Sequence, residues 1–257
     1  MKLYFAFFVF FVGCRSFAEE SKSESKLDSK SPWAHESELS IVSSGGNTKS
    51  ETYSAKQKTS YTLDASKLTA AASYLQGKSS ETDKVTGVST EVKSLKWDAS
   101  LRYDYAFNEI FGAYAGHGAE NDSDAGYVQR DNTDLGGQYT VMKSDEQSLI
   151  TEAGLRYTKT YDGTLNDYAT FGRLYAEYIR NFTKTVNFKI WAEHLPNLKA
   201  TQSYLSNAEA SLSVILSSTF SLKTAYLAKY HNHQVSPAVV EDKRLDTLLT
   251  TALVAKF

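Results

Sequence analysis

The last residues of the chain, 245-LDTLLTTALVAKF-257, alternate with a two-residue period and end on an aromatic. Leu245 and Leu253 fall on one face of this stretch, and Asp246 and Lys256 fall on the other. Such a period places successive side chains on opposite faces of a strand. A strand with one apolar face, one more polar face and a terminal aromatic is typical of the strand that closes a bacterial outer-membrane β-barrel.

The composition suits a protein made of many strands. The chain has 257 residues, with 17 Tyr and 13 Phe but only 3 Pro and 14 Gly. Aromatic residues favour strands, and a low content of Pro and Gly argues against a disordered chain. The mean hydropathy of −0.40 would suit a soluble protein. In a transmembrane barrel, however, about half of each strand faces a polar interior, so this average does not separate the two classes.

Residues 1–18 predict an export signal. Lys2 supplies the positive charge, 3–12 form an apolar run too short to span a bilayer as a helix, and 16–18 form a cleavage site. Residues 12–14 also resemble a lipoprotein cleavage site, so lipidation of Cys14 is an open alternative. Cleavage after residue 18 leaves a mature chain without Cys, with 26 basic and 30 acidic residues. That acidic balance disfavours a nucleic-acid partner.

Residues 19–33 follow the signal as a run of Ser, Lys, Glu and Asp that ends at Pro32 and Trp33. This composition cannot bury a core, so we predict a disordered periplasmic leader; a short partner-binding tail is the alternative. Trp33 is expected to anchor at the inner membrane interface. Residues 34–257 are then expected to form the barrel.

Alternation with period two recurs throughout residues 34–257, and no apolar segment there approaches the length of a membrane helix. In the clearest example, Trp97 and Leu101 alternate with Asp98 and Arg102. The pattern predicts an all-β fold, an antiparallel up-and-down transmembrane β-barrel of about 12 strands. The expected strands are 36–44, 49–63, 67–77, 88–104, 110–119, 127–142, 147–159, 167–180, 185–195, 204–216, 221–231 and 243–257.

The predicted connections are of two kinds. Short ones fall at every second junction: 64–66, 106–109, 143–146, 181–184 and 217–218. The intervening ones are mostly longer: 79–87, 120–126, 160–166, 196–202 and 232–242. Short periplasmic turns and long outer loops are the outer-membrane pattern, and an even number of strands places both termini in the periplasm. A soluble β-sandwich or lipocalin-like barrel is the competing fold, which the export signal and terminal Phe257 disfavour.

Charged residues on the face without aromatics predict a polar lumen. We expect Asp98 to pair with Arg102, and Glu152 with Arg156. About twelve strands lies between the small barrels filled by side chains and the wide porins. The charges therefore either brace and plug the barrel or line a narrow pore of mixed charge and little ion selectivity. The residues predicted to line the lumen are Lys56, Lys58, Lys96, Asp98, Arg102, Glu152, Arg156, Glu177, Glu193 and Glu209.

Two motifs have a partial resemblance to metal sites. Asp122-x-Asp124-x-Gly126 looks like part of a calcium loop but lacks the later bidentate Glu, so a solvated loop is the favoured interpretation. His231-x-His233 could place two imidazoles on one strand face, but no Cys or close carboxylate set completes a site. We predict no metal and no cofactor.

His117, flanked by two glycines, invites comparison with barrel phospholipases that set a His and a Ser at the lipid-facing surface. The spacing identifies no matching Ser and no orienting Asn, so no catalytic residue is predicted. A barrel hydrolase is kept as an alternative function. A barrel that binds ligands through its outer loops is another.

The stretch 33–50 resembles the opening of the salt-induced outer membrane proteins, a bacterial family of unknown function. Trp33, Ser40 and 45-GGNT-48 carry the resemblance, and 136-GGQY-139, which only approximates Gly-x-Gly-Tyr, and 152-EAGLRY-157 are similar in character. The resemblance covers 33–257. It implies an outer-membrane barrel and a link to salt stress, and it supplies no catalytic residues. By its chemistry 45–48 is a hairpin turn, because Gly and Asn tolerate positive φ and a strand, not a helix, follows.

The predicted function is therefore that of a non-enzymatic barrel, structural or a narrow pore, in the bacterial outer membrane. Its expected partners are outer-membrane lipid and the barrel-assembly machinery, the latter through the C-terminal strand. Phe257 is expected to serve as assembly signal and interface anchor.

Overall fold

A computed structural model describes residues 31–44, 48–82, 89–122, 125, 127–200, 202–232 and 244–257. The predicted export signal, most of the leader and residues 45–47 of the expected hairpin turn lie outside this part of the chain. Across the described ranges, no helix is long and apolar enough to cross a membrane. The described barrel belongs to the compact unit Pro32–Phe257.

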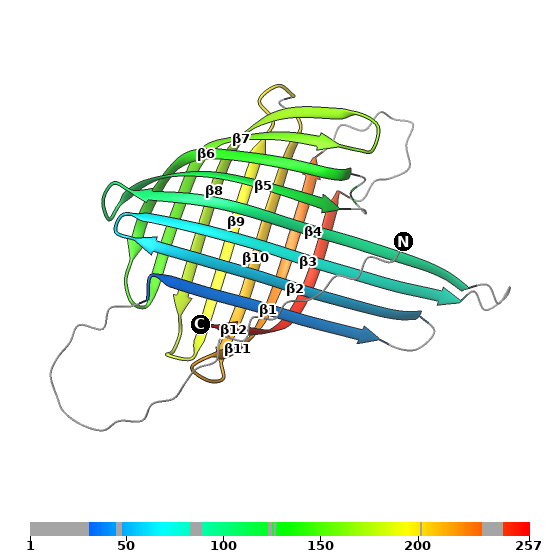
Figure 1. Ribbon diagram of the computed structural model, residues 1–257, viewed down its shortest axis with the longest axis horizontal. Helices are drawn as coiled ribbons and strands as arrows, with labels where there is room; N and C mark the ends of the chain where they lie inside the picture. The colour runs from blue at the N-terminus through cyan, green and yellow to red at the C-terminus, as the bar shows by residue number, and fades with distance from the viewer. Residues whose placement is uncertain are drawn as a thin grey trace. The chain divides into compact units, whose positions relative to one another are not determined.

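Strands β1 to β12 form a closed barrel in which each strand pairs antiparallel with its neighbours in sequence, and β12 returns to β1 (Figure 1). The predicted antiparallel barrel of about 12 strands is confirmed. The strands are β1 (Trp33–Ser44), β2 (Thr48–Leu63), β3 (Ser66–Thr82), β4 (Ser89–Ala106), β5 (Phe111–Asp122), β6 (Tyr127–Lys143), β7 (Gln147–Tyr161), β8 (Asn166–Asn181), β9 (Val186–Pro196), β10 (Tyr204–Ile215), β11 (Phe220–Asn232) and β12 (Leu245–Lys256).

One end of the barrel, here called the turn side, carries the short turns 64–65, 107–110, 144–146, 182–185 and 216–219 together with Trp33 and Phe257. The tightest turn needs a left-handed residue, which Asp64 supplies with φ of 49°. The opposite end is called the loop side. There the connection 162–165, expected to be long, is no longer than the turn 182–185, because β7 and β8 extend beyond their predicted ends.

The 162–165 connection is a compact turn held by its first residue. The Asp162 carboxylate accepts hydrogen bonds from the backbone N–H of Thr164 at 2.7 Å and of Leu165 at 2.8 Å. These backbone donors, that of Leu165 first, hold the pKa of Asp162 below its usual range. Gly163 takes the positive φ of 105° that the turn requires.

The register of the ladders separates the strands into two faces. The outward face carries exposed large apolar side chains: Leu135 is 65% exposed and Leu155, opposite it on the next strand, 53%. The inward face buries charged side chains, among them Glu38, Glu152, Arg173 and Glu193. A soluble barrel would have the reverse arrangement. The apolar exterior and charged interior are those of a transmembrane barrel.

Aromatic side chains form girdles at both edges of the outward apolar band. On the turn side, Trp33 contacts Tyr61, with ring centroids 4.7 Å apart, and Phe111 contacts Tyr139 at 5.2 Å. On the loop side, Tyr204 and Tyr230 lie 5.9 Å apart. Aromatic belts of this kind mark the two interfaces between membrane and water.

The closure between β1 and β12 is shorter than any other strand pairing. It runs from Glu36↔Lys256 to Leu39↔Leu253, and the backbones of His35 and Phe257 exchange two more hydrogen bonds of 3.0 Å. Beyond Leu39↔Leu253 the described strands are not paired with each other, although β1 continues to Ser44 and β12 begins at Leu245. Figure 1 shows the two strands running apart from this point.

Candidate functional site

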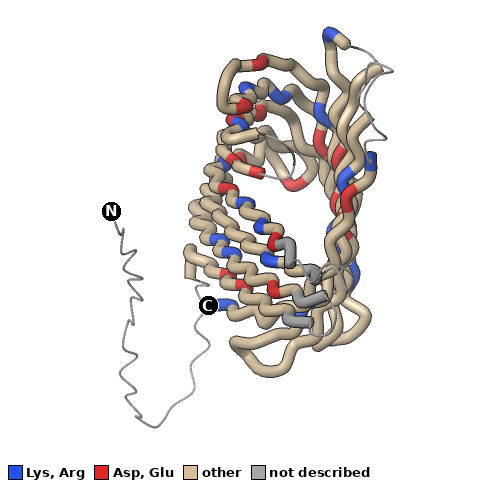
Figure 2. Tube along the Cα trace, turned by 90° about the vertical axis from the view of Figure 1, so that its right-hand side faces the viewer, with Lys and Arg blue, Asp and Glu red and all other residues tan. Residues whose placement is uncertain are grey.

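The charged interior is the candidate site, and the residues predicted to line the lumen all lie on its face. Lys56 and Lys58 alternate with outward residues of β2, Lys96, Asp98 and Arg102 with those of β4, and the remaining members lie inward on β7 to β10. Figure 2 shows Lys, Arg, Asp and Glu distributed along the strands of the wall. The interior charges divide into an arginine-rich group on β4 to β9 and a lysine-rich group on β1, β2 and β8 to β12.

The arginine-rich group, called the arginine cluster, is carried by strands β4 to β9. It comprises Arg102, Asp104, Tyr114, Asp134, Glu152, Arg156, Arg173 and Glu193.

Tyr114 is the member of the arginine cluster that lies against the barrel wall. Its ring lies on the inner wall beside Gly136 and Gly154, the residues opposite it on β6 and β7, and the side chain is only 2% exposed. A Cβ on Gly136 would lie 2.5 Å from the Tyr114 hydroxyl, and one on Gly154 would lie 2.7 Å from it. Only glycine therefore leaves room for the ring against the wall.

Arg102 forms the next layer above Tyr114. Its guanidinium carbon lies 4.2 Å from the centre of the Tyr114 ring, within cation–π distance. From β4 it reaches across β5 and β6 to Glu152 on β7, donating at 2.6 and 3.2 Å. It also donates to Asp104 at 2.6 and 2.8 Å. The Arg102 side chain thus spans the interior as a chord between strands that are not neighbours.

Arg173 is the most buried cation of the arginine cluster, with a side chain 6% exposed. It donates to Glu152 at 2.6 Å, to Glu193 at 2.7 Å and to the Tyr114 hydroxyl at 2.8 Å. Hydrogen bonds between ionised partners are short and strong, and they compensate for the lost hydration of these buried charges.

Arg156 completes the arginine cluster on its loop side. It forms a bidentate pair with Asp134 at 2.7 Å for both bonds and also donates to Glu193 at 3.1 and 3.2 Å. Asn207 donates to Glu193 at 3.3 Å. Glu193, on β9, is therefore linked through its partners to β7, β8 and β10.

These contacts correct the expected pairing. Arg102 pairs with Asp104 and Glu152 instead of Asp98, and Arg156 pairs with Asp134 and Glu193 instead of Glu152. The expected partners lie four residues apart on one strand, roughly 13 Å at a rise of about 3.3 Å per residue. Neighbouring strands lie only about 5 Å apart and a residue two positions along the same strand about 7 Å away. The partners therefore come from other strands or, for Asp104, from two positions along the same strand. Asp98 instead accepts a hydrogen bond from Ser73 on the adjacent strand.

A cavity of about 1390 Å³, called the vestibule, lies on the loop side of the arginine cluster. Arg102, Tyr114, Asp134, Arg156 and Glu193 form part of its lining, and Arg102 lies farthest along its strand from the loop side. Nearer the loop side, its wall includes Arg130. The guanidinium carbon of Arg130 lies 3.9 Å from the centre of the Tyr127 ring, and its Nη1 lies 3.5 Å from Oε1 of Glu120. None of the described residues that line the vestibule belongs to the lysine-rich group.

The lysine-rich group, called the lysine set, consists of ion pairs made by lysine ammonium groups, together with Lys58, which lies opposite Glu36 on the next strand. Glu38 is shared by Lys223 at 3.1 Å and Lys56 at 3.5 Å, and Lys189 meets Glu177 at 2.6 Å. The lysine set comprises Glu36, Glu38, Lys56, Lys58, Glu177, Lys189, Glu209, Lys223 and Lys256.

The motifs with partial metal-site character do not assemble a site. Asp122 is paired with Lys96 at 3.1 Å on the inward face of β5, and Asp124 and Gly126 lie outside the described residues. His231 lies inward on β11 and lines the vestibule, and His233 is likewise outside the described part. Within the described residues, no group of His, Cys, Asp or Glu is arranged to hold a metal ion.

His117 faces outward, toward lipid, and its Nδ1 lies 2.9 Å from the Thr133 hydroxyl directly opposite on β6. The same cross-strand pair recurs between His35 and Thr59 at 3.0 Å and between His194 and Ser206 at 2.9 Å. A contact repeated on separate strand pairs is a way to satisfy a histidine on an apolar face.

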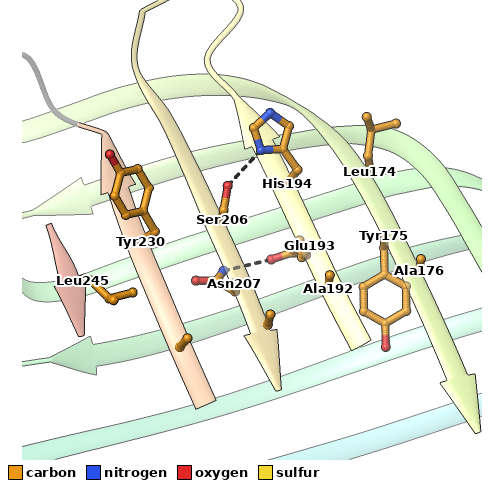
Figure 3. A pocket seen from close by; sticks show the side chains of 12 residues that line it. Leu174, Tyr175, Ala176, Ala192, Glu193, His194, Ser206, Asn207, Tyr230 and Leu245 are labelled. Atoms are coloured by element: carbon orange, nitrogen blue, oxygen red, sulfur yellow. Dashed lines mark hydrogen bonds between the residues drawn. The ribbon is translucent and has the colours of Figure 1, made fainter. Parts of the chain in front are cut away.

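Figure 3 shows the third of these pairs in an outward depression of about 500 Å³. Ala176, Ala192, Ala208 and Ala228 stand in register across β8 to β11 and form its floor. The Asn207–Glu193 bond in the same view belongs to the other face of these strands. A strip of small side chains thus interrupts the lipid-facing surface.

Trp33 and Phe257 lie at the turn-side edge. Phe257 is 72% exposed and Trp33 50%, and Phe257 exchanges its backbone hydrogen bonds with His35, two residues from Trp33. Both aromatics therefore sit where β12 meets β1.

Sequence reasoning did not single out Tyr114, Asp134 or Arg173 as site residues. A signal for Tyr114 was present: over residues 112–118 it is the one bulky side chain on a face otherwise formed by Gly112, Gly116 and Gly118.

Solved structures with similar folds are membrane barrels of low sequence identity. An outer-membrane channel from Pseudomonas putida F1 matches with 12% identity and a TM-score of 0.49, over 88% of this chain and 94% of that one. The NanC porin matches with 10% identity and a TM-score of 0.47, over 86% and 97%. The translocator domain of autotransporter NalP from Neisseria meningitidis matches with 12% identity and a TM-score of 0.44, over 88% and 87%.

No curated protein matches the sequence. A family match covers residues 37–257, which is nearly the whole barrel, including the glycines that seat Tyr114 and the 152–157 stretch that supplies Glu152 and Arg156. The chain therefore belongs to the family described as "Protein of unknown function, DUF481".

Proposed function

We propose that the protein is a non-enzymatic barrel of the bacterial outer membrane that acts as a narrow pore, with the arginine cluster as its constriction. The observation that carries this proposal is that members of the arginine cluster line the vestibule, with Arg102 farthest along its strand from the loop side. Layers of side chains, from Tyr114 on the wall to the Arg102–Glu152 chord, extend from the wall into the interior there. Charges of both signs stand close together, so we expect weak selectivity between cations and anions.

Placement in the outer membrane is supported by the apolar exterior, the two aromatic girdles and the meeting of Trp33 and Phe257 at one edge. As part of the same proposal, residues 1–18 direct export and 19–33 remain in the periplasm. The C-terminal strand is then the element that the barrel-assembly machinery recognises. Lipid is the expected partner of the outward face.

The family resemblance adds an expected link to salt stress. The lysine set offers a physical route for such a link, because one of its pairs is exposed: the Lys256–Glu36 side chains are 61% and 38% exposed. Exposed pairs weaken as ionic strength rises, whereas buried pairs are screened far less.

A barrel hydrolase acting through His117 is the second candidate, and it predicts that turnover of an ester lipid is lost in His117→Ala. The recurrence of the His–hydroxyl pair on other strands favours a structural role instead. Binding through the outer loops would depend on segments such as 232–242, most of which lies outside the described residues.

Planar-bilayer recording of the refolded protein tests the pore. The wild type should show small unitary conductances, and Arg102→Ser should enlarge them several-fold, because it removes the chord to Glu152 without touching Arg173. Arg130→Ser is the matched control, since Arg130 lines the vestibule away from the constriction. Equal conductance of wild type and Arg102→Ser would contradict the constriction, and folded protein without any channels would leave a purely structural barrel.

A further inference from the structure

The line along which β1 meets β12, called here the seam, is fastened in its turn-side half. Glu36 of β1 meets Lys256, directly opposite on β12, at 3.1 Å. Glu38 meets Lys223 of β11, on the far side of β12, also at 3.1 Å. Both ion pairs lie on the inward face of the paired part of the closure, and they hold β1 against β12 there.

Ser40 occupies the point where the two strands separate. Its hydroxyl donates to the backbone carbonyl of Thr251 at 2.7 Å, and the residue is 8% exposed. In the paired part, odd-numbered residues of both strands turn their backbone groups toward each other. Continuing that register would give the Thr251 carbonyl to the N–H of Ile41. The Ser40 hydroxyl therefore takes the place of the next backbone hydrogen bond of the seam.

The separated parts of β1 and β12 are complementary on their inward faces. Val42 is the inward residue that follows Ser40, and it is 47% exposed although its side chain is apolar. The same register would place Val42 opposite Thr250 and diagonally next to Leu248. Leu248 itself lies inward beside Leu227 of β11. Continued pairing would therefore bury an apolar contact on the inward face.

The separated strand edges lie at the level of the lipid hydrocarbon. Leu245 is opposite Tyr230 of the loop-side girdle, so the unpaired part of β12 lies within the apolar band, and Leu249 on its outward face is 66% exposed. Unpaired backbone groups are strongly unfavourable in hydrocarbon. Only another strand edge offers donors and acceptors at matching intervals. The free edge of β1 begins at the same point of separation and is therefore the nearest such partner.

The seam also borders the vestibule. The described residues that line the vestibule come from β4 to β12 and the connections between these strands, and none comes from β1, β2 or β3. The lining ends at Asp246 of β12, the strand from which β1 stands apart at this level. The position of β1 therefore determines whether the barrel wall continues beyond this edge of the vestibule.

We propose that the seam is a two-state closure of the barrel wall. In the open state, described above, Ser40 caps the point of separation. In the closed state, β1 and β12 pair as far as Ser43 and Leu249, and Ser40 releases the Thr251 carbonyl to Ile41. The ion pairs of Glu36 and Glu38 fasten the turn-side half in both states. This closure is separate from the arginine cluster, and it holds whether or not ions pass the constriction.

Disulfide formation measures the closed state. The continued register makes Val42 and Thr250 a non-hydrogen-bonded pair, in which side chains lie close together. Val42→Cys/Thr250→Cys, in a Cys14→Ser background, is folded as the full-length protein into phosphatidylcholine vesicles and oxidised, and non-reducing gels follow the intramolecular bond. Glu36→Cys/Lys256→Cys, an equivalent pair in the fastened half, gives the rate for strands that are always paired. The Val42/Thr250 pair should oxidise to completion but several-fold more slowly, because only the closed fraction reacts.

Ser40→Ala tests the role of the hydroxyl. It removes the partner of the Thr251 carbonyl in the open state alone, so the closed fraction should grow. The Val42/Thr250 pair should then oxidise about fivefold faster, the usual effect of one hydrogen bond. Ser37→Ala is the matched control, because the Ser37 hydroxyl donates to Gln57 of β2 and not across the seam. It should leave the rate unchanged.

Three results would overturn the proposal. Absence of the intramolecular disulfide would show a seam that is always open, and oxidation as fast as that of the Glu36/Lys256 pair would show one that is always closed. A rate unchanged by Ser40→Ala would show that Ser40 does not set the balance between the states. A disulfide between two copies, formed through Val42→Cys alone, would assign the free edge to a second copy of the chain and would also contradict the closure.

Discussion

The arginine cluster and the lysine set carry similar charges in the same interior but are built differently. Arg173 has partners on β5, β7 and β9 and a side chain only 6% exposed. Lys256 meets Glu36 through one nitrogen at 3.1 Å, with a side chain 61% exposed. Guanidinium groups supply several donors in a fixed plane and can join three carboxylates, whereas an ammonium on a flexible stem acts as a point charge. The arginine cluster is therefore a cross-linked layer, whereas the lysine set is joined through single ammonium groups and includes an exposed pair, Lys256–Glu36, that stands apart.

Removing one cation from each group should give the largest difference in stability between the two groups. Arg173→Ala leaves Glu152 and Glu193 short of a buried partner and should lower the free energy of unfolding by about 3–5 kcal/mol. Lys256→Gln, the matched control, should cost at most about 1 kcal/mol. Urea unfolding from lipid vesicles, followed by Trp fluorescence, measures both.

Raising the ionic strength should separate the effects of the same two variants further. The cost of Lys256→Gln should vanish at high ionic strength, and that of Arg173→Ala should persist, because buried pairs are screened less. Equal costs for the two variants would mean that the arginine cluster is no more cross-linked than the lysine set.

A smaller effect tests the space that Gly136 and Gly154 leave for the Tyr114 ring. In Gly154→Ala the new Cβ would collide with the Leu135 carbonyl and lie 2.7 Å from the Tyr114 hydroxyl. Overpacking of this kind costs about 1–3 kcal/mol. Gly77→Ala is the control, because its nearest neighbour, the Ser94 Cβ, lies 3.5 Å away. The same unfolding assay should show a lower urea midpoint for Gly154→Ala and little change for Gly77→Ala. The reverse order would refute the need for glycine beside Tyr114.

The fold could be predicted from the sequence because the side chains of a barrel strand alternate between lipid and the polar interior, and this alternation shows within each strand. Alternation such as Trp97, Asp98, Leu101 and Arg102 needs no knowledge of neighbouring strands, and it placed the strands near their observed positions. Ends were less accurate: β5 continues to Asp122, where a loop was expected from 120. Strand ends depend on ladder hydrogen bonds, which are contributed by another segment of the chain.

The architecture of the site was not accessible in the same way. The period shows that Arg102 and Glu152 share a face, but their contact depends on the register of β4 to β7 and on the room that Gly136 and Gly154 leave for Tyr114. The incomplete closure between β1 and β12 is a further example. Ser40 and Thr251 lie in strands with ordinary alternation, and only the three-dimensional path of β1 and β12 shows that pairing stops between them.

The central claim, a charged vestibule inside and lipid outside, is tested most directly by single cysteines on neighbouring strands. Asn132 and Thr160 line the vestibule, while Leu135 and Leu155 are exposed on the outward face. Each is replaced by Cys in a Cys14→Ser background, folded into phosphatidylcholine vesicles and treated with a charged, water-soluble maleimide. Asn132→Cys and Thr160→Cys should react, and Leu135→Cys and Leu155→Cys should be protected. Rapid reaction at Leu135→Cys and Leu155→Cys would contradict the membrane barrel.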